Sequence, residues 1–360
     1  MARSHTPELM RQQKRDVVLD AIRAHGPISR VELARQLHIT PATITRITRT
    51  LLDEGLIREE GEGENRGAGR KPVLLCFNPR SRLVIGIYVN SNQITGAVTD
   101  LSGAILTRRT SFPCAALSEA TLRNLLSDLL NIDPSYHPRL TAVCVGAHPS
   151  SPVEEALLTR LQRALEVPVL SAEVVALAAH GEARWGTMRE QSRFAVLYLG
   201  SHSYSCLYLD GVTHVGNLGL SPTGQSLGAR LCDAGLQARV QAALDSGMAS
   251  VFHNSHQQHP PSSVIFEAAR QGDPVARLAI EDVAGDIAFT TVWRANAMNL
   301  SQIVLAGPWA QAADVLLPAT RAQMRALSTQ PPDLLPADLG NDAPLLGAIS
   351  VAIDLADATV

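Results

Sequence analysis

The sequence contains no apolar run long enough to span a bilayer, and its beginning lacks the apolar core of a secretory signal. We therefore expect a cytoplasmic protein without a membrane partner. Its cysteines are scattered without paired spacing, which favours reduced, buried thiols over a disulfide framework. These cysteines are Cys76, Cys114, Cys144, Cys206 and Cys232.

Tryptophan is also scarce. Trp185, Trp293 and Trp309 are too far apart in sequence for an aromatic sugar platform, so we expect them in the core or in an interface. Charged residues make up 18% of the chain and hydrophobic residues 46%, which indicates a well-packed globular protein rather than a disordered one. The 360 residues leave room for two or three domains.

Charge is distributed unevenly. The whole chain carries a formal net charge of −3, but residues 1–80 hold fourteen Lys or Arg against ten Asp or Glu. The first 80 residues are therefore net +4 and the remainder is net −7. A positive end on a weakly negative chain favours nucleic acid as the partner of that end.

Helix signals are dense in this positive end. Ser29 and Glu32 form an S-x-x-E capping box, which predicts a helix from Arg30 through Leu37. Thr40 as N-cap and a proline at the first helical position predict a second helix over residues 41–55, ending at a glycine. A preceding helix with Val17, Val18 and Ile22 should complete a small core.

The second helix is the candidate recognition helix. Its buried stripe of Ile44, Ile47 and Leu51 leaves the opposite face to Ala42, Thr45, Arg46 and Arg49. Arginine can bind guanine with two hydrogen bonds, and threonine can contact base edges or a thymine methyl in the major groove. We predict that double-stranded DNA is contacted by Ala42, Thr43, Thr45, Arg46 and Arg49. A pair of ordinary surface helices is the alternative.

A Gly-rich hairpin ending in GRKP follows and completes the pattern of a winged helix-turn-helix. Glycines allow a thin backbone to enter a minor groove, whose negative potential attracts basic side chains. We assign DNA contact to Arg66, Arg70 and Lys71, and the solvent-facing flank to Glu59, Glu60, Glu62 and Glu64. A flexible linker is the alternative interpretation of this segment.

The rest of the chain alternates strands and helices, with a hinge expected around residues 78–80. Residues 82–112 read as three consecutive strands with turns at 90–92 and 101–103, and residues 194–216 as three more. Further strands are expected at 141–145, 167–170 and 303–306, and helices at 119–130, 154–165 and 174–185. Two repeats of a strand meander followed by helix-strand alternation predict two α/β lobes with a cleft between them.

This arrangement resembles the ROK family, which groups bacterial sugar-responsive repressors with sugar kinases on an actin-like, two-lobed fold. The resemblance covers the winged domain, IGIYVNSNQITGAVTDLSGAIL, GEARWG, IVLAGPWAQA and LGNDAPLLGAISVAI. It implies an α/β fold with a winged helix-turn-helix at 1–77 and a first ROK lobe at 78–190. A helix at about 343–360 would complete that lobe, and residues 191–342 would form a second, oligomerising lobe.

The motifs of the family's kinases are missing. The first phosphate turn, D-x-G-G-T in the kinases, corresponds to Tyr88, Asn90, Ser91 and Asn92, and only Gly200 survives of the second, G-T-G-x-G. The N-D-x-N motif with the catalytic base corresponds to residues 173–176, where valine replaces the aspartate. We therefore expect no catalytic residue, no cofactor and no enzyme activity.

The sugar and zinc motifs are missing as well. The G-E-x-G-H segment corresponds to residues 216–220, GNLGL, and the cysteine knuckle is reduced to Cys232, which alone cannot build a zinc site. His253, His256 and His259 lie in an expected loop and are read as solvated rather than metal-binding. Glu182 and Asp342 are read as helix-terminal or surface carboxylates rather than catalytic ones. No metal site is expected.

The resemblance implies a DNA-binding transcriptional regulator, a repressor by family precedent, connected with carbohydrate metabolism. Paired operator half-sites favour a homodimer or a tetramer. A small-molecule effector, a sugar or another compound, would bind in the cleft through Asn90, Asn92, Glu173, His202 and Asn217. Two alternatives stay open: a sugar kinase with an appended DNA-binding domain, and an effector-independent regulator controlled by a protein partner.

Overall fold

The computed structural model describes residues 7–62, 71–90, 93–112, 118–149, 152–254 and 259–358. The chain forms two compact units. The first comprises Met1–Leu83 with Asp100–Ala104 and Ser135–Leu140, and the second comprises the remainder. The boundaries expected at residues 77, 190 and 342 remain predictions.

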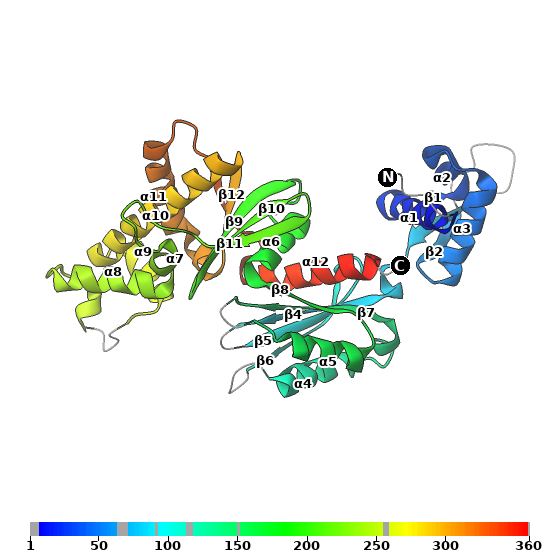
Figure 1. The fold of residues 1–360 in the computed structure, drawn as a ribbon, viewed down its shortest axis with the longest axis horizontal. Helices are drawn as coiled ribbons and strands as arrows, with labels where there is room; N and C mark the ends of the chain where they lie inside the picture. Colours follow the sequence, from blue (N-terminus) through cyan, green and yellow to red (C-terminus); the bar gives the residue numbers. More distant parts are fainter. Residues whose placement is uncertain are drawn as a thin grey trace. The chain divides into compact units, whose positions relative to one another are not determined.

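The first unit is a three-helix domain with a small antiparallel sheet (Figure 1). Its helices are α1 (Pro7–His25), α2 (Arg30–Leu37) and α3 (Pro41–Asp53), and its strands are β1 (Ile28–Ser29), β2 (Ile57–Glu62) and β3 (Val73–Phe77), in the order β1-β3-β2. The predicted helices at Arg30 and Pro41 are confirmed at those residues. The expectation that Val17 joins the core is wrong, because its side chain is 48% exposed while Val18 and Ile22 are buried.

The second unit contains two five-stranded sheets of the same plan, a three-strand meander followed by two strands in parallel. The first sheet has the order β6-β5-β4-β7-β8 and the second β11-β10-β9-β12-β13. The predicted meanders are confirmed. The first sheet consists of β4 (Leu83–Val89), β5 (Ile94–Asp100), β6 (Ile105–Ser111), β7 (Leu140–Ala147) and β8 (Val169–Glu173). The second consists of β9 (Arg193–Leu199), β10 (Ser203–Leu209), β11 (Val212–Gly216), β12 (Gln302–Ala306) and β13 (Asp333–Pro336).

Strand β8 differs from its prediction of 167–170. The ladder with β7 begins at Val169 and extends to Glu173. Pro168 has no backbone N–H to donate, so it contributes only its carbonyl, which accepts from the Val143 N–H at 3.0 Å. The shift places Glu173 at the end of the strand and directly before α6.

Helices cover both faces of the first sheet (Figure 1). Those on one face are α4 (Glu119–Leu130) and α5 (Glu155–Leu165), and α12 (Ala343–Ala358) lies on the other. Helix α6 (Val174–Trp185) packs against α12 and against β9, β10 and β11 of the second sheet. Helix α12 packs closely on both its neighbours. A Cβ on Gly347 would overlap the Leu177 carbonyl of α6, and one on Gly86 of β4 would come within 2.6 Å of Ile349.

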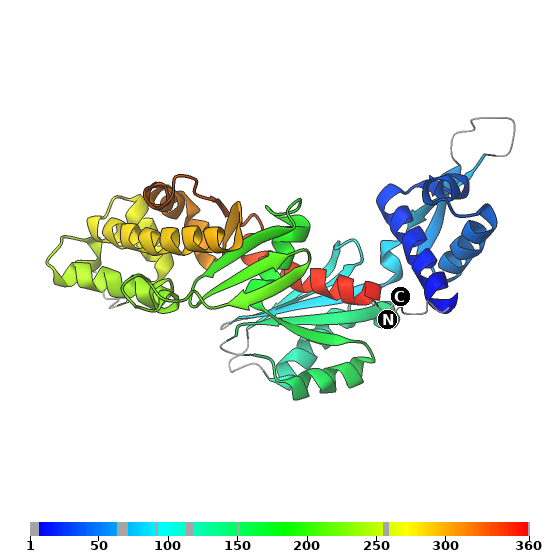
Figure 2. The ribbon, with the colours of Figure 1, turned by 45° about the horizontal axis from the view of Figure 1, so that its top comes forward.

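The second sheet carries a helical layer built around a buried apolar core (Figures 1 and 2). The layer comprises α7 (Leu227–Arg230), α8 (Asp233–Asp245), α9 (Ser262–Arg270), α10 (Pro274–Met298) and α11 (Ala313–Leu327). Short 3-10 turns complete the fold at Pro79–Ser81, His137–Arg139, Val251–Asn254, Pro308–Ala312 and Gly340–Asp342.

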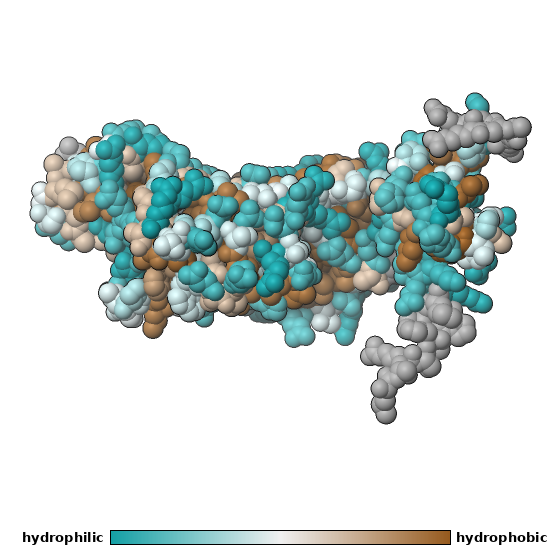
Figure 3. Space-filling model, turned by 90° about the horizontal axis from the view of Figure 1, so that it is seen from above, coloured by the Kyte–Doolittle hydropathy of each residue, from teal (hydrophilic) through white to brown (hydrophobic). Residues whose placement is uncertain are grey.

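Hydrophilic and hydrophobic residues are interspersed on the face shown in Figure 3. Of the helices that the structure describes, none has the length and apolar character needed to cross a membrane.

Candidate DNA-binding surface and cleft

Helix α3 is positioned by a tight turn after α2. His38 ends α2 in the left-handed conformation, with φ of 52°, and its N–H donates to the Ala34 carbonyl. Thr40 begins α3 from an extended backbone, and its hydroxyl donates to Thr43 Oγ1 at 2.9 Å. The side chains of Ile44 and Leu51, on the inner face of α3, are fully buried. The turn and the buried stripe together determine which face of α3 is presented to solvent.

The outward face of α3 carries the predicted recognition residues. Ala42, Thr45, Arg46 and Arg49 are exposed, and Thr43 is half-buried. Thr45 also donates its hydroxyl to the Pro41 carbonyl at 2.9 Å. The Thr50 hydroxyl donates to the Arg46 carbonyl at 3.3 Å, but within the described part of the chain no ion pair or hydrogen bond involves the guanidinium group of Arg46 or Arg49. Both guanidinium groups are therefore available to an external partner such as DNA.

Arg30 connects the recognition helix to the wing. Its Nε donates to the Thr48 hydroxyl of α3 at 3.1 Å, and its Nη2 pairs with Glu59 of β2 at 3.0 Å. Thr48 is fully buried, which makes this contact part of the packing between α2 and α3. Sequence reasoning identified Arg30 only as a helix start, because nothing in the local pattern indicated its distant partners.

The structure describes only part of the wing. Strands β2 and β3 pair antiparallel, and Glu59 and Glu60 are exposed as predicted. Lys71 is exposed. Arg66 and Arg70, together with the side chains of Glu62 and Glu64, lie outside the described residues, so the predicted minor-groove contacts of the wing remain predictions.

The second unit contains a cavity of about 400 Å³ where strands of its two sheets end. Tyr88 of β4, Tyr198 of β9 and His148, which follows β7, contribute aromatic side chains. The remaining lining residues are Asn90, Gln93, Ser201 and Pro308. In sheets with parallel strands, ligands commonly bind beyond the carboxyl ends of the strands, which makes this cavity the candidate ligand site.

His148 is the centre of the aromatic cluster in the cavity. Its Nε2 lies 3.4 Å from the Tyr88 hydroxyl, which itself lies 3.4 Å from the Tyr198 hydroxyl. The rings of His202 and Tyr204 each lie 6.1 Å from the His148 ring. Burial, and to a lesser extent the nearby His202, lowers the pKa of His148. Burial raises the pKa of Tyr88, so the surroundings favour the uncharged forms of His148 and Tyr88.

The five predicted effector residues do not all lie at this cavity. Asn90 lines the cavity, and His202 stacks on Tyr204 beside it with ring centroids 6.2 Å apart. Glu173 is exposed and is not among the lining residues. Asn217 lies in another pocket, where its carbonyl accepts from Arg294. Asn92 lies outside the described residues. Ligand contact by all five remains a prediction.

Sequence reasoning missed His148 and Tyr198 as cavity residues. His148 follows directly after a buried strand and Tyr198 lies near the end of another, and this placement is the signal that could have identified both. The surviving Gly200 has a packing explanation. A Cβ there would lie 2.9 Å from Cδ of Pro308, so the glycine is required by its neighbour rather than by a phosphate.

Buried apolar residues occupy the position of the family's catalytic base. Val174 and Val175 are fully buried at the start of α6. Glu182 lies in the last turn of α6, which agrees with the helix-terminal position expected for it, but it is not on the surface. It is fully buried and accepts from the backbone N–H groups of Thr187 at 2.8 Å and Leu339 at 3.0 Å. Asp342 is half-exposed and pairs with Arg108 at 2.6 Å.

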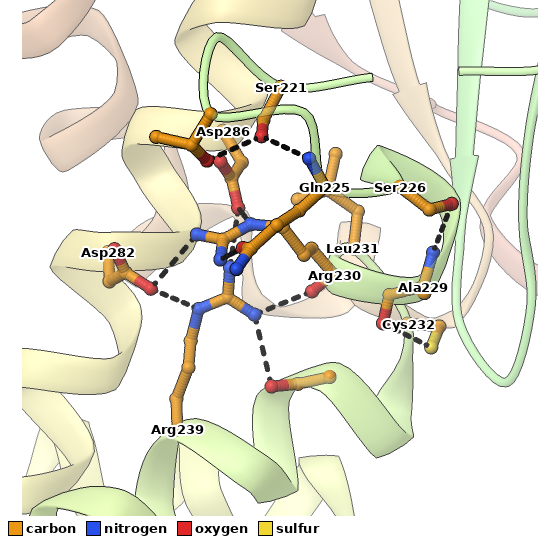
Figure 4. Close-up of polar contacts among 12 residues, drawn as sticks. Ser221, Gln225, Ser226, Ala229, Arg230, Leu231, Cys232, Arg239, Asp282 and Asp286 are labelled. Atoms are coloured by element: carbon orange, nitrogen blue, oxygen red, sulfur yellow. Dashed lines mark hydrogen bonds and ion pairs between the residues drawn. The ribbon is translucent and has the colours of Figure 1, made fainter. Parts of the chain in front are cut away.

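An ion-pair network occupies the segment that corresponds to the family's zinc knuckle (Figure 4). Arg230 and Arg239 converge on Asp286 of α10, where Arg230 Nε lies 2.7 Å from the carboxylate. Both arginines also contact Asp282, and Arg239 donates to the Arg230 carbonyl at 2.7 Å. We call these four residues the arginine–aspartate clip.

The residues of this segment do not fit zinc. The Cys232 thiol donates to the Ala229 carbonyl at 3.2 Å, and no group of three His, Cys, Asp or Glu within the described ranges is arranged to hold a metal. A structural zinc site needs four such ligands. In this chain, the clip fastens the segment to α10 instead. His253 and His259 are exposed, and His256 lies outside the described residues.

Comparison with protein families identifies two matching regions. A model described as the ROK family matches residues 84–355, and one described as the MarR family matches residues 15–66. Two curated relatives match over most of their length. The "DNA-binding transcriptional dual regulator NagC" of Escherichia coli K12 is 25% identical over 87% of this chain and 84% of its own. The "Xylose repressor" of Bacillus subtilis is 24% identical over 94% of each chain.

Solved structures share the fold. A ROK family transcriptional regulator described as a homologue of the E. coli Mlc protein superposes with a TM-score of 0.80 and 22% identity, covering 97% of each chain. A ROK family glucokinase from Streptomyces griseus, solved with glucose and AMPPNP, gives a TM-score of 0.62 and 20% identity, covering 76% of this chain and 99% of its own.

Proposed function

Because the chain belongs to the ROK family, we propose that it is a DNA-binding transcriptional regulator that acts as a repressor. One observation carries the proposal: α3 presents Arg46 and Arg49 on an exposed face, with no ion-pair partner among the described residues, within a segment that also matches the MarR family. The curated relatives with the names "N-acetylglucosamine repressor" and "Xylose repressor" support it. By analogy with them, carbohydrate metabolism is the proposed physiological context.

In this proposal the amino-terminal half of α3 enters the major groove. Arg46 donates two hydrogen bonds to a guanine, while Thr45 and Ala42 contact neighbouring base edges or thymine methyls. The wing places Lys71, Arg66 and Arg70 against phosphates and the minor groove. A homodimer or tetramer would present pairs of these domains to a two-fold symmetric operator.

The direct test is a mobility shift with the purified full-length protein and its own upstream intergenic DNA at fixed salt. We expect specific binding that withstands an excess of unrelated DNA and weakens in Arg46→Ala. Arg325→Ala, an exposed arginine on α11, is the matched control and should bind like the wild type. If the wild type shows no preference for the upstream DNA, the proposed function is wrong.

The glucokinase-like fold makes a sugar kinase the second candidate. The candidate is disfavoured because a buried valine occupies the position of the base and Tyr88 that of the phosphate-binding acid. Loss of a general base alone typically removes about 10²- to 10⁴-fold in rate. We propose that the chain has no kinase activity. Incubation with ATP and a panel of hexoses and amino sugars tests this proposal. Phosphotransfer above background would support the sugar-kinase candidate instead.

The remaining role of the ROK domain is that of oligomerisation scaffold and ligand sensor. An effector that binds one arrangement of the domain better than another shifts the population toward it, and DNA affinity changes accordingly. A regulator controlled only by a protein partner would lack such an effector. Stabilisation of the folded protein by a small molecule distinguishes the two, because a ligand that binds only the native state must raise its stability.

A further inference from the structure

The cavity beside His148 differs from a phosphate site in the charge of its walls. Its lining residues within the described part of the chain include no Lys, Arg, Asp or Glu. A phosphate group carries up to two negative charges at neutral pH, and burying it without a cation or a set of converging N–H donors is strongly unfavourable. The described lining therefore offers no charged side chain to neutralise a phosphorylated ligand.

The same walls suit an uncharged ring. The hydroxyls of Tyr88, Tyr198 and Ser201 and the amides of Asn90 and Gln93 can each donate and accept hydrogen bonds. Tyr88, His148 and Tyr198 add ring faces against which a flat or apolar face can pack. The cavity of about 400 Å³ is within the usual size range of small-molecule sites.

We propose that this cavity binds a small uncharged ring compound with hydrogen-bonding groups on its edge, and that it rejects the phosphate ester of the same compound. The uncharged ring can come from a free sugar or from a planar heterocycle, which share this chemistry. The proposal rests on the sensor role given to the ROK domain, and it specifies the class of effector for that role.

The lowered pKa of His148 agrees with the proposal. Burial disfavours the imidazolium form, and a second positive charge on His202, whose ring lies 6.1 Å away, would disfavour it further. The other described rings against His148 are those of Tyr88, Tyr198 and Tyr204, and burial raises the pKa of Tyr88 and of Tyr198, so neither brings a carboxylate-like charge to offset an imidazolium. Among the described lining residues, His148 is therefore a poor source of positive charge for an anion.

The test compares matched pairs of free compound and ester by isothermal titration and thermal shift. Suitable pairs are glucose with glucose 6-phosphate, N-acetylglucosamine with its 6-phosphate, and adenosine with AMP. We expect at least one free compound to bind, and its ester to bind at least about tenfold more weakly, a difference of about 1.4 kcal/mol. The sugar and heterocycle arms identify which source supplies the ring.

Variants localise the binding. Tyr88→Phe removes one hydroxyl of the pair while keeping the ring, and we expect the free compound to bind at least fivefold more weakly. Gln93→Lys adds a cation to the lining and should shift the preference toward the ester. His214→Gln, in a different pocket, is the control and should leave binding unchanged.

Three outcomes would overturn the inference: an ester that binds as tightly as its free compound, binding insensitive to both cavity variants, or no binding by any compound. DNA binding is measured separately on the same preparation. Specific DNA binding without ligand binding would overturn this inference alone, whereas loss of specific DNA binding would overturn the proposed function.

Discussion

The hydroxyl of Tyr88 in β4 lies 3.4 Å from the hydroxyl of Tyr198 in β9, and this pair joins the two sheets of the second unit. Tyr88 stands where ROK kinases carry the acid of their first phosphate turn. An aromatic side chain therefore stands at one of the positions where this chain differs from the family's kinases, beside the differences at the second phosphate turn and at residues 173–176.

Substitutions of two arginines test base recognition and contact with the DNA backbone separately. We expect Arg46→Ala to relax base preference in the operator, because it removes a side chain from the exposed face of α3. We expect Arg70→Ala to weaken binding with less change in preference and to reduce the slope of log K against log salt by about one. Titrations over a set of single-base operator variants at several salt concentrations measure both effects. Equal, sequence-independent losses would contradict the assignment of Arg46 as a base reader.

The arginine–aspartate clip should stabilise the segment that corresponds to the zinc knuckle of the family. Asp286 is 8% exposed and receives two guanidinium groups, so Asp286→Ala should lower the free energy of unfolding by about 3 kcal/mol. Asp282→Ala is the matched control. Because the Asp282 side chain is half-exposed, we expect this substitution to lower the free energy of unfolding by less than about 1 kcal/mol. Urea unfolding measures both changes.

Metal removal provides a further check on the clip. Dialysis against a strong zinc chelator should leave the urea midpoint of the wild type unchanged, because Cys232 has no metal-binding partners among the residues that the structure describes. A lower midpoint after dialysis, restored by zinc, would show that the segment binds a metal.

The close contact of α12 with α6 should be sensitive to one methyl group. A Cβ on Gly347 would overlap the backbone of Leu177, which cannot move without displacing α6. We expect Gly347→Ala to lower stability by about 2 kcal/mol, in the range typical of overpacking. Gly228→Ala in α7 is the control, because the nearest atom to its Cβ would be 3.7 Å away. Equal unfolding midpoints for the two variants would contradict the packing account.

Much of this architecture was predictable from local signals. Caps and prolines identified the starts of α2 and α3, and apolar alternation identified both meanders, because these features depend on neighbours in sequence. The tertiary partners were not predictable. Nothing near Arg230 or Glu182 in sequence indicates that Asp286 or the Leu339 N–H would lie beside them. His148 was missed for the same reason, since its role depends on tyrosines 60 and 50 residues away that reach it only in the folded sheets.

The half-buried imidazoles of His148 and His180 should make stability depend on pH. Burial is the leading cause of the lowered pKa of both His148 and His180 in the folded protein, so the unfolded chain binds more protons below its own histidine pKa of about 6.5. Stability is therefore retained above that pH and declines as the pH falls from about 6.5 toward the lower folded-state values. His148→Gln removes one of the two groups and should flatten the decline between pH 6.5 and pH 5, whereas His259→Gln, an exposed histidine, should not. Urea midpoints across this range measure the slopes, and identical slopes in wild type and His148→Gln would exclude His148 as a source of the pH dependence.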